Sequence, residues 1–120
     1  MADHNDLGKK GEELAFNYLI KKGYKILCRN YRFKRNEIDI IAEFENTLII
    51  IEVKTRASRF LAGPEETVTK GKQKTIIKVA HEYIIENEID LDTQFDIISI
   101  ILNEKETHIE HLIDAFYPIL

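Results

Sequence analysis

The chain has 120 residues, 44% hydrophobic and 32% charged, with a net charge of −4, which is the composition of a soluble globular protein and excludes a disordered one. This length predicts one domain, residues 1–120, around a single core. The lone Cys28 excludes an internal disulfide and favours the reducing cytoplasm, while the polar, acidic N-terminus and the short apolar stretches argue against a secretory signal and a membrane span.

The first predicted element is an amphipathic helix. Asn5 or Asp6 can cap it, and its apolar residues recur at helical spacing as far as about Lys22. Gly23 follows in the position where glycine ends helices. Residues 24–33 then alternate partly between apolar and polar side chains, which predicts a strand.

Two further strands are predicted over residues 36–42 and 47–55, joined by the turn-like residues 43–46. Residues 48–51 are apolar on both faces, as expected of a central strand covered on two sides. Asparagine tolerates a left-handed backbone, so we expect a turn at Asn36, before Glu-Ile-Asp.

The second half of the chain continues the α/β pattern. Residues 56–68 contain Gly63-Pro64 and predict a loop that contacts substrate or acts as a lid, after which Thr69 caps a second helix. Residues 94–102 predict a core strand and residues 107–113 an edge strand. The predicted order is αβββαββ, an α/β domain with a mixed β-sheet flanked by α-helices.

Acidic residues at the ends of two apolar strands indicate a candidate site. Glu52 and Lys54 are two residues apart and therefore share one face of their strand. If the strands at 36–42 and 47–55 form a hairpin, Asp39 lies beside that pair. Placing these charges next to an apolar segment carries a desolvation cost unless a metal or partner compensates.

The first helix offers a third carboxylate. At 100° per residue, Glu12 falls on the flank of the apolar stripe, close to Leu19, whereas Glu13 faces water. We therefore expect Glu12, and not Glu13, to point toward the sheet and act beside Asp39 and Glu52.

Carboxylate oxygens are the ligands that Mg²⁺ and Mn²⁺ prefer. We expect Asp39 and Glu52 to bind such an ion, with the backbone carbonyl of Val53 as an additional oxygen ligand. A bound ion would polarise a phosphodiester and activate water, and Lys54 would orient that water or stabilise the developing charge.

The spacing Asp39-x12-Glu52-Val53-Lys54 resembles the PD-(D/E)xK motif of restriction-endonuclease-like nucleases. The wider pattern, including Gly8-x-x-Gly11-Glu12 and Asn30-Tyr31-Arg32, resembles the small bacterial YraN family over nearly the whole chain. That family is similar to archaeal Holliday-junction resolvases in fold and motif order. The resemblance implies a restriction-endonuclease-like domain and a metal-dependent endonuclease acting on branched or structured DNA in repair or recombination. Because four-way junctions are two-fold symmetric, a resolvase would be a homodimer.

The charge distribution supports a DNA partner. Residues 1–60 hold 12 Lys and Arg against 9 Asp and Glu, whereas residues 61–120 hold 5 against 12, which gives one basic and one acidic half. The basic residues expected to contact nucleic acid are Arg32, Lys34, Arg35, Arg56 and Lys72.

Several alternatives stay open at this stage. Glu37 and Gln73 can each support the site from outside or simply face solvent, and Asp96 can be a structural carboxylate within its strand. His108 and His111 are expected on opposite faces of their strand, which makes them poor joint metal ligands. The chain can also be a non-catalytic DNA-binding or scaffolding module that keeps the nuclease fold, or a protein-interaction domain that uses the acidic residues 82–92.

Overall fold

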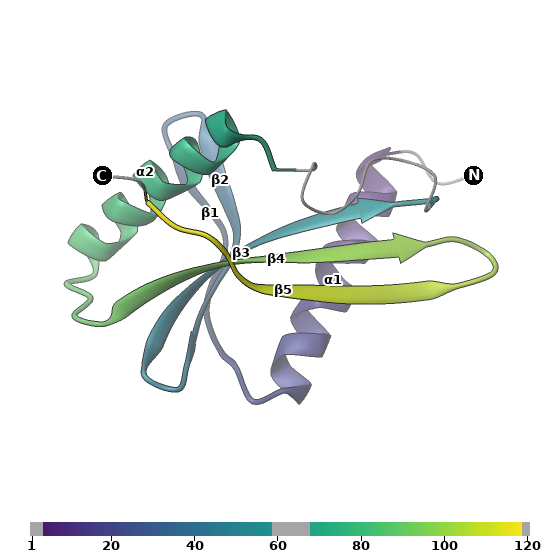
Figure 1. Ribbon diagram of the computed structural model, residues 1–120, viewed down its shortest axis with the longest axis horizontal. Helices are drawn as coiled ribbons and strands as arrows, with labels where there is room; N and C mark the ends of the chain where they lie inside the picture. Colours follow the sequence, from purple (N-terminus) through teal and green to yellow (C-terminus); the bar gives the residue numbers. More distant parts are fainter. Residues whose placement is uncertain (1–3, 59–67, 119–120) are drawn as a thin grey trace.

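A computed structural model describes residues 4–58 and 68–118 of the protein, which form two helices and five strands in the predicted order αβββαββ (Figure 1). The elements are α1 (His4–Lys21), β1 (Lys25–Phe33), β2 (Asn36–Phe44), β3 (Thr47–Arg56), α2 (Lys70–Glu86), β4 (Asp92–Leu102) and β5 (Thr107–Phe116). The α/β fold class is therefore confirmed. Neither of the two described helices is long and apolar enough to cross a membrane.

The five strands form one mixed sheet in the order β1-β2-β3-β4-β5. Strands β3 and β4 are parallel and are connected through α2, whereas the other three neighbouring pairs are antiparallel. The apolar residues 48–51 lie in the middle strand and are fully buried, as their two-sided pattern predicted. Strand β5 is an edge strand, also as predicted, and it extends to Phe116.

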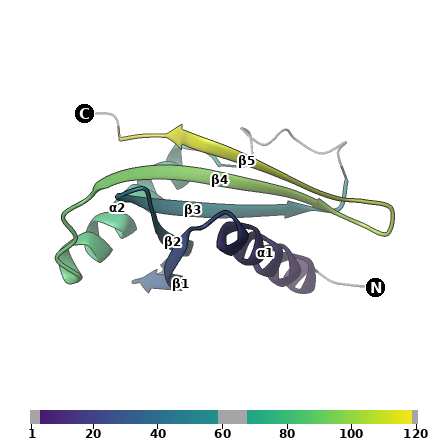
Figure 2. The same ribbon diagram turned by 90° about the horizontal axis from the view of Figure 1, so that it is seen from below.

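The helices cover opposite faces of the sheet. Alternate residues of β3 enter two separate cores: Ile49 and Ile51 pack with α1, whereas Leu48 and Ile50 pack with α2. Figure 2 shows α1 lying directly against β3. Helix α2 packs mainly on β2, so the two helices cover different parts of the sheet as well as different faces.

Local sequence signals explain most element boundaries. The Thr69 side chain accepts a hydrogen bond from the Lys72 amide at 3.1 Å, which caps α2 as predicted. Gly23, with a φ of 95°, follows the end of α1. The turn expected before Glu-Ile-Asp is present, but Lys34 takes the left-handed conformation, with a φ of 59°, and Asn36 begins β2. Residues 59–67 of the predicted lid loop lie outside the described residues.

The β2–β3 pairing is incomplete, and this shapes the site. The antiparallel ladder runs from the Phe44–Thr47 pair to the Ile40–Ile51 pair and ends there. Beyond that point β2 pairs with β1, and β3 pairs with β4, so the two strands diverge like a fork (Figure 1). Asp39 and Glu52 are the first residues beyond the last pair, at the opening of the fork.

Candidate functional site

The end of the β2–β3 ladder explains the position of the Asp39 side chain. Where the ladder stops, backbone groups of β3 that face β2 lose their strand partner and need another one. The Asp39 carboxylate provides it, because its Oδ2 accepts a hydrogen bond from the Val53 amide at 2.8 Å. Asp39 is thereby fixed beside Glu52, as the hairpin hypothesis predicted.

A cavity of about 290 Å³ opens at the fork. It lies between β2, β3 and the start of α2, and its lining is mostly polar. The lining residues are Arg35, Asn36, Glu37, Asp39, Glu52, Lys72, Thr75 and Ile76. Three carboxylates therefore share one cavity with two basic side chains.

Glu52 is the most buried charged group of this cavity, with 8% of its surface exposed. Its Oε2 atom has no hydrogen-bond partner within the described part of the chain, and the nearest cation is Lys72 Nζ at 3.5 Å. A buried carboxylate oxygen without a hydrogen bond carries a desolvation cost that the exposed Lys72 ammonium offsets only in part.

Two acids in one confined space also alter each other's protonation. Burial, followed by the shared contact with Glu52 and its charge, raises the pKa of Asp39 to about 9, although the Val53 amide acts in the opposite direction. Without a cation between them, the two groups therefore retain a proton at neutral pH. A cation bound between Asp39 and Glu52 would therefore stabilise the folded protein.

Glu12 reaches the same region from α1. Asn30 donates one hydrogen bond to Glu12 Oε1 at 3.0 Å and another to Glu37 Oε1 at 2.7 Å. Burial raises the pKa of Glu12, as do the charges of Asp39 and Glu37. Glu13 instead forms an exposed ion pair with Arg29 at 2.9 Å, which agrees with the prediction that only Glu12 faces the sheet.

Close helix packing positions Glu12. A Cβ atom built on Gly11 would lie 1.7 Å from Thr55 Oγ1, so no larger residue fits between α1 and β3 at this point. Gly8, one turn earlier, has nothing within 4 Å of such an atom. The chain therefore needs Gly11 for the close approach that brings the next residue, Glu12, toward the fork.

Asn30 is the site residue that sequence reasoning missed. It was noticed only as part of a family pattern, although its left-handed backbone, with a φ of 52°, departs from a regular strand. Asparagine favours turns and is uncommon in strands. Its presence in the middle of a predicted strand is therefore a sequence signal for an irregular backbone at Asn30.

Two other predicted site residues, Lys54 and Gln73, do not line the cavity of the carboxylates. Lys54 is exposed and is not among the residues that line the cavity. The side-chain nitrogen of Gln73 donates to the Val68 carbonyl at 3.2 Å, and Gln73 lines a different cavity. The Val53 amide is bonded to Asp39, and its carbonyl role stays a prediction.

The five predicted nucleic-acid contacts differ in exposure. Arg35 and Lys72 line the cavity and are exposed. Arg32 lies 3.6 Å from Glu37, and the Lys34 ammonium lies 5.4 Å from the centre of the Phe33 ring. Arg56 differs from them because only 8% of its surface is exposed, so it is not a surface contact in this structure.

The donor set fits a hard cation bound by few protein ligands. Among the described residues, no group of three or more His, Cys, Asp and Glu side chains is arranged to hold a metal ion. Mg²⁺ commonly uses only one or two carboxylates and completes its octahedron with water and substrate phosphate. Glu52, whose Oε2 has no hydrogen bond, beside Asp39 matches that pattern.

Comparison with known proteins gives the family. Residues 11–100 match the model of the uncharacterised protein family UPF0102. A UPF0102 protein of Flavobacterium psychrophilum is 50% identical over 117 residues, and one of Christiangramia forsetii is 49% identical, each with 98% of both chains covered. The chain belongs to the UPF0102 family. The YraN-type resemblance is thereby confirmed, and UPF0102 is a family without an assigned activity.

A solved structure similar to this UPF0102 chain is that of SfsA from Pyrococcus furiosus in complex with Ca²⁺. The identity is 12% and the TM-score 0.39, with 86% of this chain and 62% of that chain covered. A TM-score at this level does not establish a shared fold.

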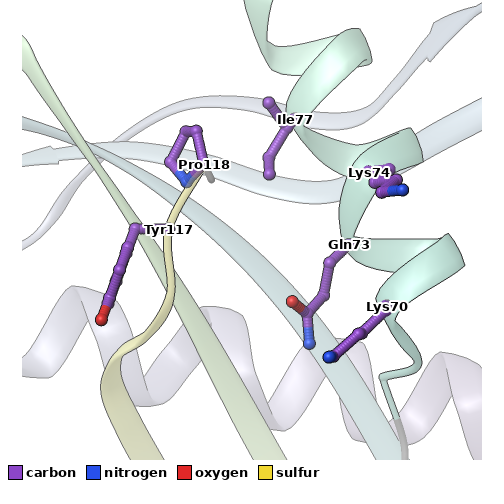
Figure 3. A pocket seen from close by; sticks show the side chains of 6 residues that line it. All are labelled: Lys70, Gln73, Lys74, Ile77, Tyr117 and Pro118. Carbon is purple, nitrogen blue, oxygen red and sulfur yellow. The ribbon is translucent and has the colours of Figure 1, made fainter. Parts of the chain in front are cut away.

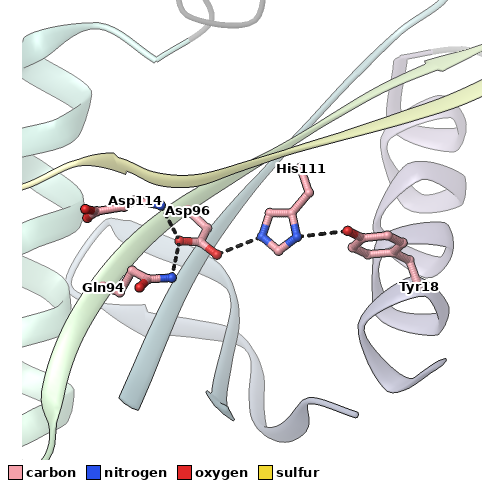
Figure 4. Close-up of polar contacts among 5 residues, drawn as sticks. All are labelled: Tyr18, Gln94, Asp96, His111 and Asp114. Carbon is pink, nitrogen blue, oxygen red and sulfur yellow. Dashed lines mark hydrogen bonds and ion pairs between the residues drawn. The ribbon is translucent and has the colours of Figure 1, made fainter. Parts of the chain in front are cut away.

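The UPF0102 chain contains a second buried acid, Asp96, in β4 (Figure 4). Its Oδ1 accepts hydrogen bonds from Gln94 Nε2 at 3.0 Å and from the Asp114 amide at 2.9 Å. Its Oδ2 lies 2.7 Å from His111 Nε2, and His111 Nδ1 lies 3.0 Å from the Tyr18 hydroxyl. The network joins β4, β5 and α1, and it supports the structural reading of Asp96.

Proposed function

We propose that this protein is a metal-dependent endonuclease that hydrolyses DNA phosphodiesters. The observation that carries the proposal is the pair Asp39 and Glu52, which face one cavity where a buried Glu52 oxygen has no hydrogen bond and lies 3.5 Å from the exposed Lys72 ammonium. A structural carboxylate normally has both oxygens hydrogen-bonded, as Asp96 does. The match of Asp39-x12-Glu52-Val53-Lys54 to the PD-(D/E)xK pattern supports the same conclusion.

The proposed cofactor is Mg²⁺ or Mn²⁺. Asp39, Glu52 and the Val53 carbonyl would hold the ion, and Glu12 would act from the α1 side through its proximity to Asp39. A divalent ion there supplies Lewis-acid activation of the phosphodiester and of the attacking water. Asn30 holds the carboxylates of Glu12 and Glu37 in fixed positions, which keeps the acidic side of the cavity ordered.

The basic residues around the cavity would bring the DNA backbone to the acids. Lys72 lies beside Glu52, and Arg35 also lines the cavity, so both can contact phosphates that flank the reacting one. Carboxylates alone repel phosphate, so the cation should strengthen DNA binding at this cavity. The YraN-type resemblance favours branched or structured DNA in the cytoplasm as the substrate, and a resolvase of this kind would act as a homodimer.

The test is a cleavage assay with purified protein, Mg²⁺ or Mn²⁺, and a panel of single-stranded, duplex, flap and four-way DNA. We expect cleavage by the wild type and its loss in Asp39→Asn and Glu52→Gln. Glu13→Gln is the matched control, because Glu13 is an exposed acid paired with Arg29. Cleavage that persists in both cavity variants would show that these acids are not the site.

A second candidate function is DNA binding without turnover. The exposed position of Lys54, outside the cavity that holds Glu52, favours it, because the PD-(D/E)xK pattern relies on this lysine next to the reacting phosphate. This candidate predicts salt-dependent binding with no cleavage under either metal. If Lys54 acts in catalysis, Lys54→Ala removes cleavage while the affinity for DNA changes little.

A further inference from the structure

A second cavity, on the far side of the first turns of α2, matches the chemistry of a nucleotide. It has a volume of about 200 Å³ and lies between α2 and the residues that follow β5 (Figure 3). It is lined by Lys70, Gln73, Lys74, Ile77, Tyr117 and Pro118. The cavity is too small for most cofactors, which occupy larger pockets.

The lining combines an aromatic surface with hydrogen-bonding and basic groups. Tyr117 is 68% exposed, so its ring is accessible from solvent. Figure 3 shows the Gln73 carbonyl oxygen and the Lys70 ammonium pointing toward the space beside Tyr117, whereas the Lys74 ammonium points away. An apolar ring face, an amide acceptor and one cation suit a nucleobase with its phosphate.

This cavity and the carboxylate cavity lie on two faces of the same helix, α2. Lys70, Gln73 and Ile77 follow one face of α2, whereas Lys72, Thr75 and Ile76 on the other face line the carboxylate cavity. A helix with its side chains is about 10–12 Å wide, a distance that a few nucleotides of an unpaired strand can span. One strand can therefore reach both cavities across the start of α2.

We infer that the Tyr117 cavity binds an unpaired nucleotide a few positions from the phosphate held at Asp39 and Glu52. The inference rests on the proposed nuclease function and specifies its substrate as DNA with an unpaired segment. A base in a closed duplex is stacked between its neighbours and cannot also stack on Tyr117. A flap, a bulge or a junction provides a base that can.

The test measures DNA binding by fluorescence anisotropy in EDTA, where no cleavage occurs, with a single-stranded oligonucleotide and a duplex of equal length. Tyr117→Ala should weaken single-strand binding about tenfold, and Tyr117→Phe should restore it, because base stacking needs the ring and not the hydroxyl. Duplex binding should change less than twofold in both variants. Ile85→Ala, which removes another exposed hydrophobic side chain at the far end of α2, is the control.

Lys70→Gln should lower the salt dependence of single-strand binding by about 0.7 in log–log slope, the value for one phosphate contact, and Lys105→Gln in the β4–β5 turn should not. Unchanged single-strand affinity in Tyr117→Ala, or an equal loss for duplex, overturns the inference. A dimer of the wild type that Tyr117→Ala dissociates also overturns it, because a second copy would then occupy the cavity.

The two proposals fail separately. Tyr117-dependent binding of single strands without cleavage under any metal rejects the nuclease function and supports the nucleotide cavity. Cleavage of flap DNA that Tyr117→Ala leaves unchanged supports the nuclease function and rejects the cavity.

Discussion

The two buried acidic regions of this molecule are built in opposite ways. Both carboxylate oxygens of Asp96 have hydrogen-bond partners on β4 and β5. At the fork, Glu52 keeps a buried oxygen without a hydrogen bond and faces a second acid, Asp39. The difference separates an acid that stabilises the fold from acids that cost stability and therefore require another explanation.

The largest effect should come from Asp96. Replacement by Ala leaves the Gln94 amide, the Asp114 amide and His111 without their common acceptor inside the core. We expect Asp96→Ala to lower the free energy of unfolding by about 3–5 kcal/mol, because several groups lose a buried acceptor and each buried group left unpaired costs about 1–3 kcal/mol. Urea denaturation measures it. A loss below about 1 kcal/mol, as small as that of an ordinary surface substitution, would show that Asp96 does not stabilise the fold more than the acids at the fork do.

Gly11 should give the next largest effect, because it sets the distance between α1 and β3. Gly11→Ala forces a Cβ atom into Thr55, and we expect a loss of about 1–3 kcal/mol from overpacking. Gly8→Ala is the matched control in the same helix, and it should be neutral or stabilising by up to about 1 kcal/mol through better helix propensity. Equal losses in the two variants would contradict the close approach.

A substitution at the fork should raise the free energy of unfolding, whereas those at Asp96 and Gly11 lower it. Asn can still accept the Val53 amide and, unlike Asp39, needs no bound proton to be neutral beside Glu52, so Asp39→Asn should raise the stability of the metal-free protein at pH 8 by about 2 kcal/mol. Thermal and urea unfolding in EDTA, compared with Asp96→Asn, test this. A loss of stability in Asp39→Asn would place Asp39 in the same class as Asp96.

The pH dependence follows from the same pKa shift. The pKa of Asp39 is about 9 in the folded protein and near 3.8 in the unfolded chain, so the folded state binds the extra proton. Its contribution to stability is therefore fully present below about pH 4 and is lost as the pH rises toward 9. In EDTA, the free energy of unfolding of Asp39→Asn should fall less with rising pH than that of the wild type. Added Mn²⁺ should restore the lost stability in the wild type but not in Asp39→Asn. A decline of equal slope in both proteins would assign it to other groups.

The sequence predicted this architecture well because its signals are local. The two-sided apolar run at residues 48–51 identified the central strand, and helical periodicity selected Glu12 rather than Glu13. Hairpin logic brought Asp39 and Glu52 together. Each of these follows from a repeat distance within one element or between sequence neighbours.

The remaining features depend on contacts between distant segments. Lys72 lies beside Glu52 because α2 begins next to the fork, whereas strand alternation alone favoured Lys54. Asn30 connects α1 to β2, and Asp96 meets His111 only after β5 pairs with β4. No periodicity within a single element contains that information.

The smallest predicted effect distinguishes the two neighbouring glutamates. Glu13→Gln removes an exposed ion pair with Arg29 and should cost about 0.2–1 kcal/mol without changing the affinity for Mn²⁺. Glu12→Gln should weaken Mn²⁺ binding about tenfold by removing a charge near Asp39, as loss of a supporting group does at other metal sites. Isothermal titration calorimetry compares them, and equal affinities would remove Glu12 from the site.

The central claim is that Asp39 and Glu52 hold a divalent cation. Anomalous diffraction from crystals soaked in Mn²⁺ tests it most directly, with wild type and Asp39→Asn grown in the same crystal form. The account predicts an anomalous peak between the two carboxylates in the wild type and none there in Asp39→Asn. A wild-type crystal without that peak, or a peak that survives the substitution, would contradict the account.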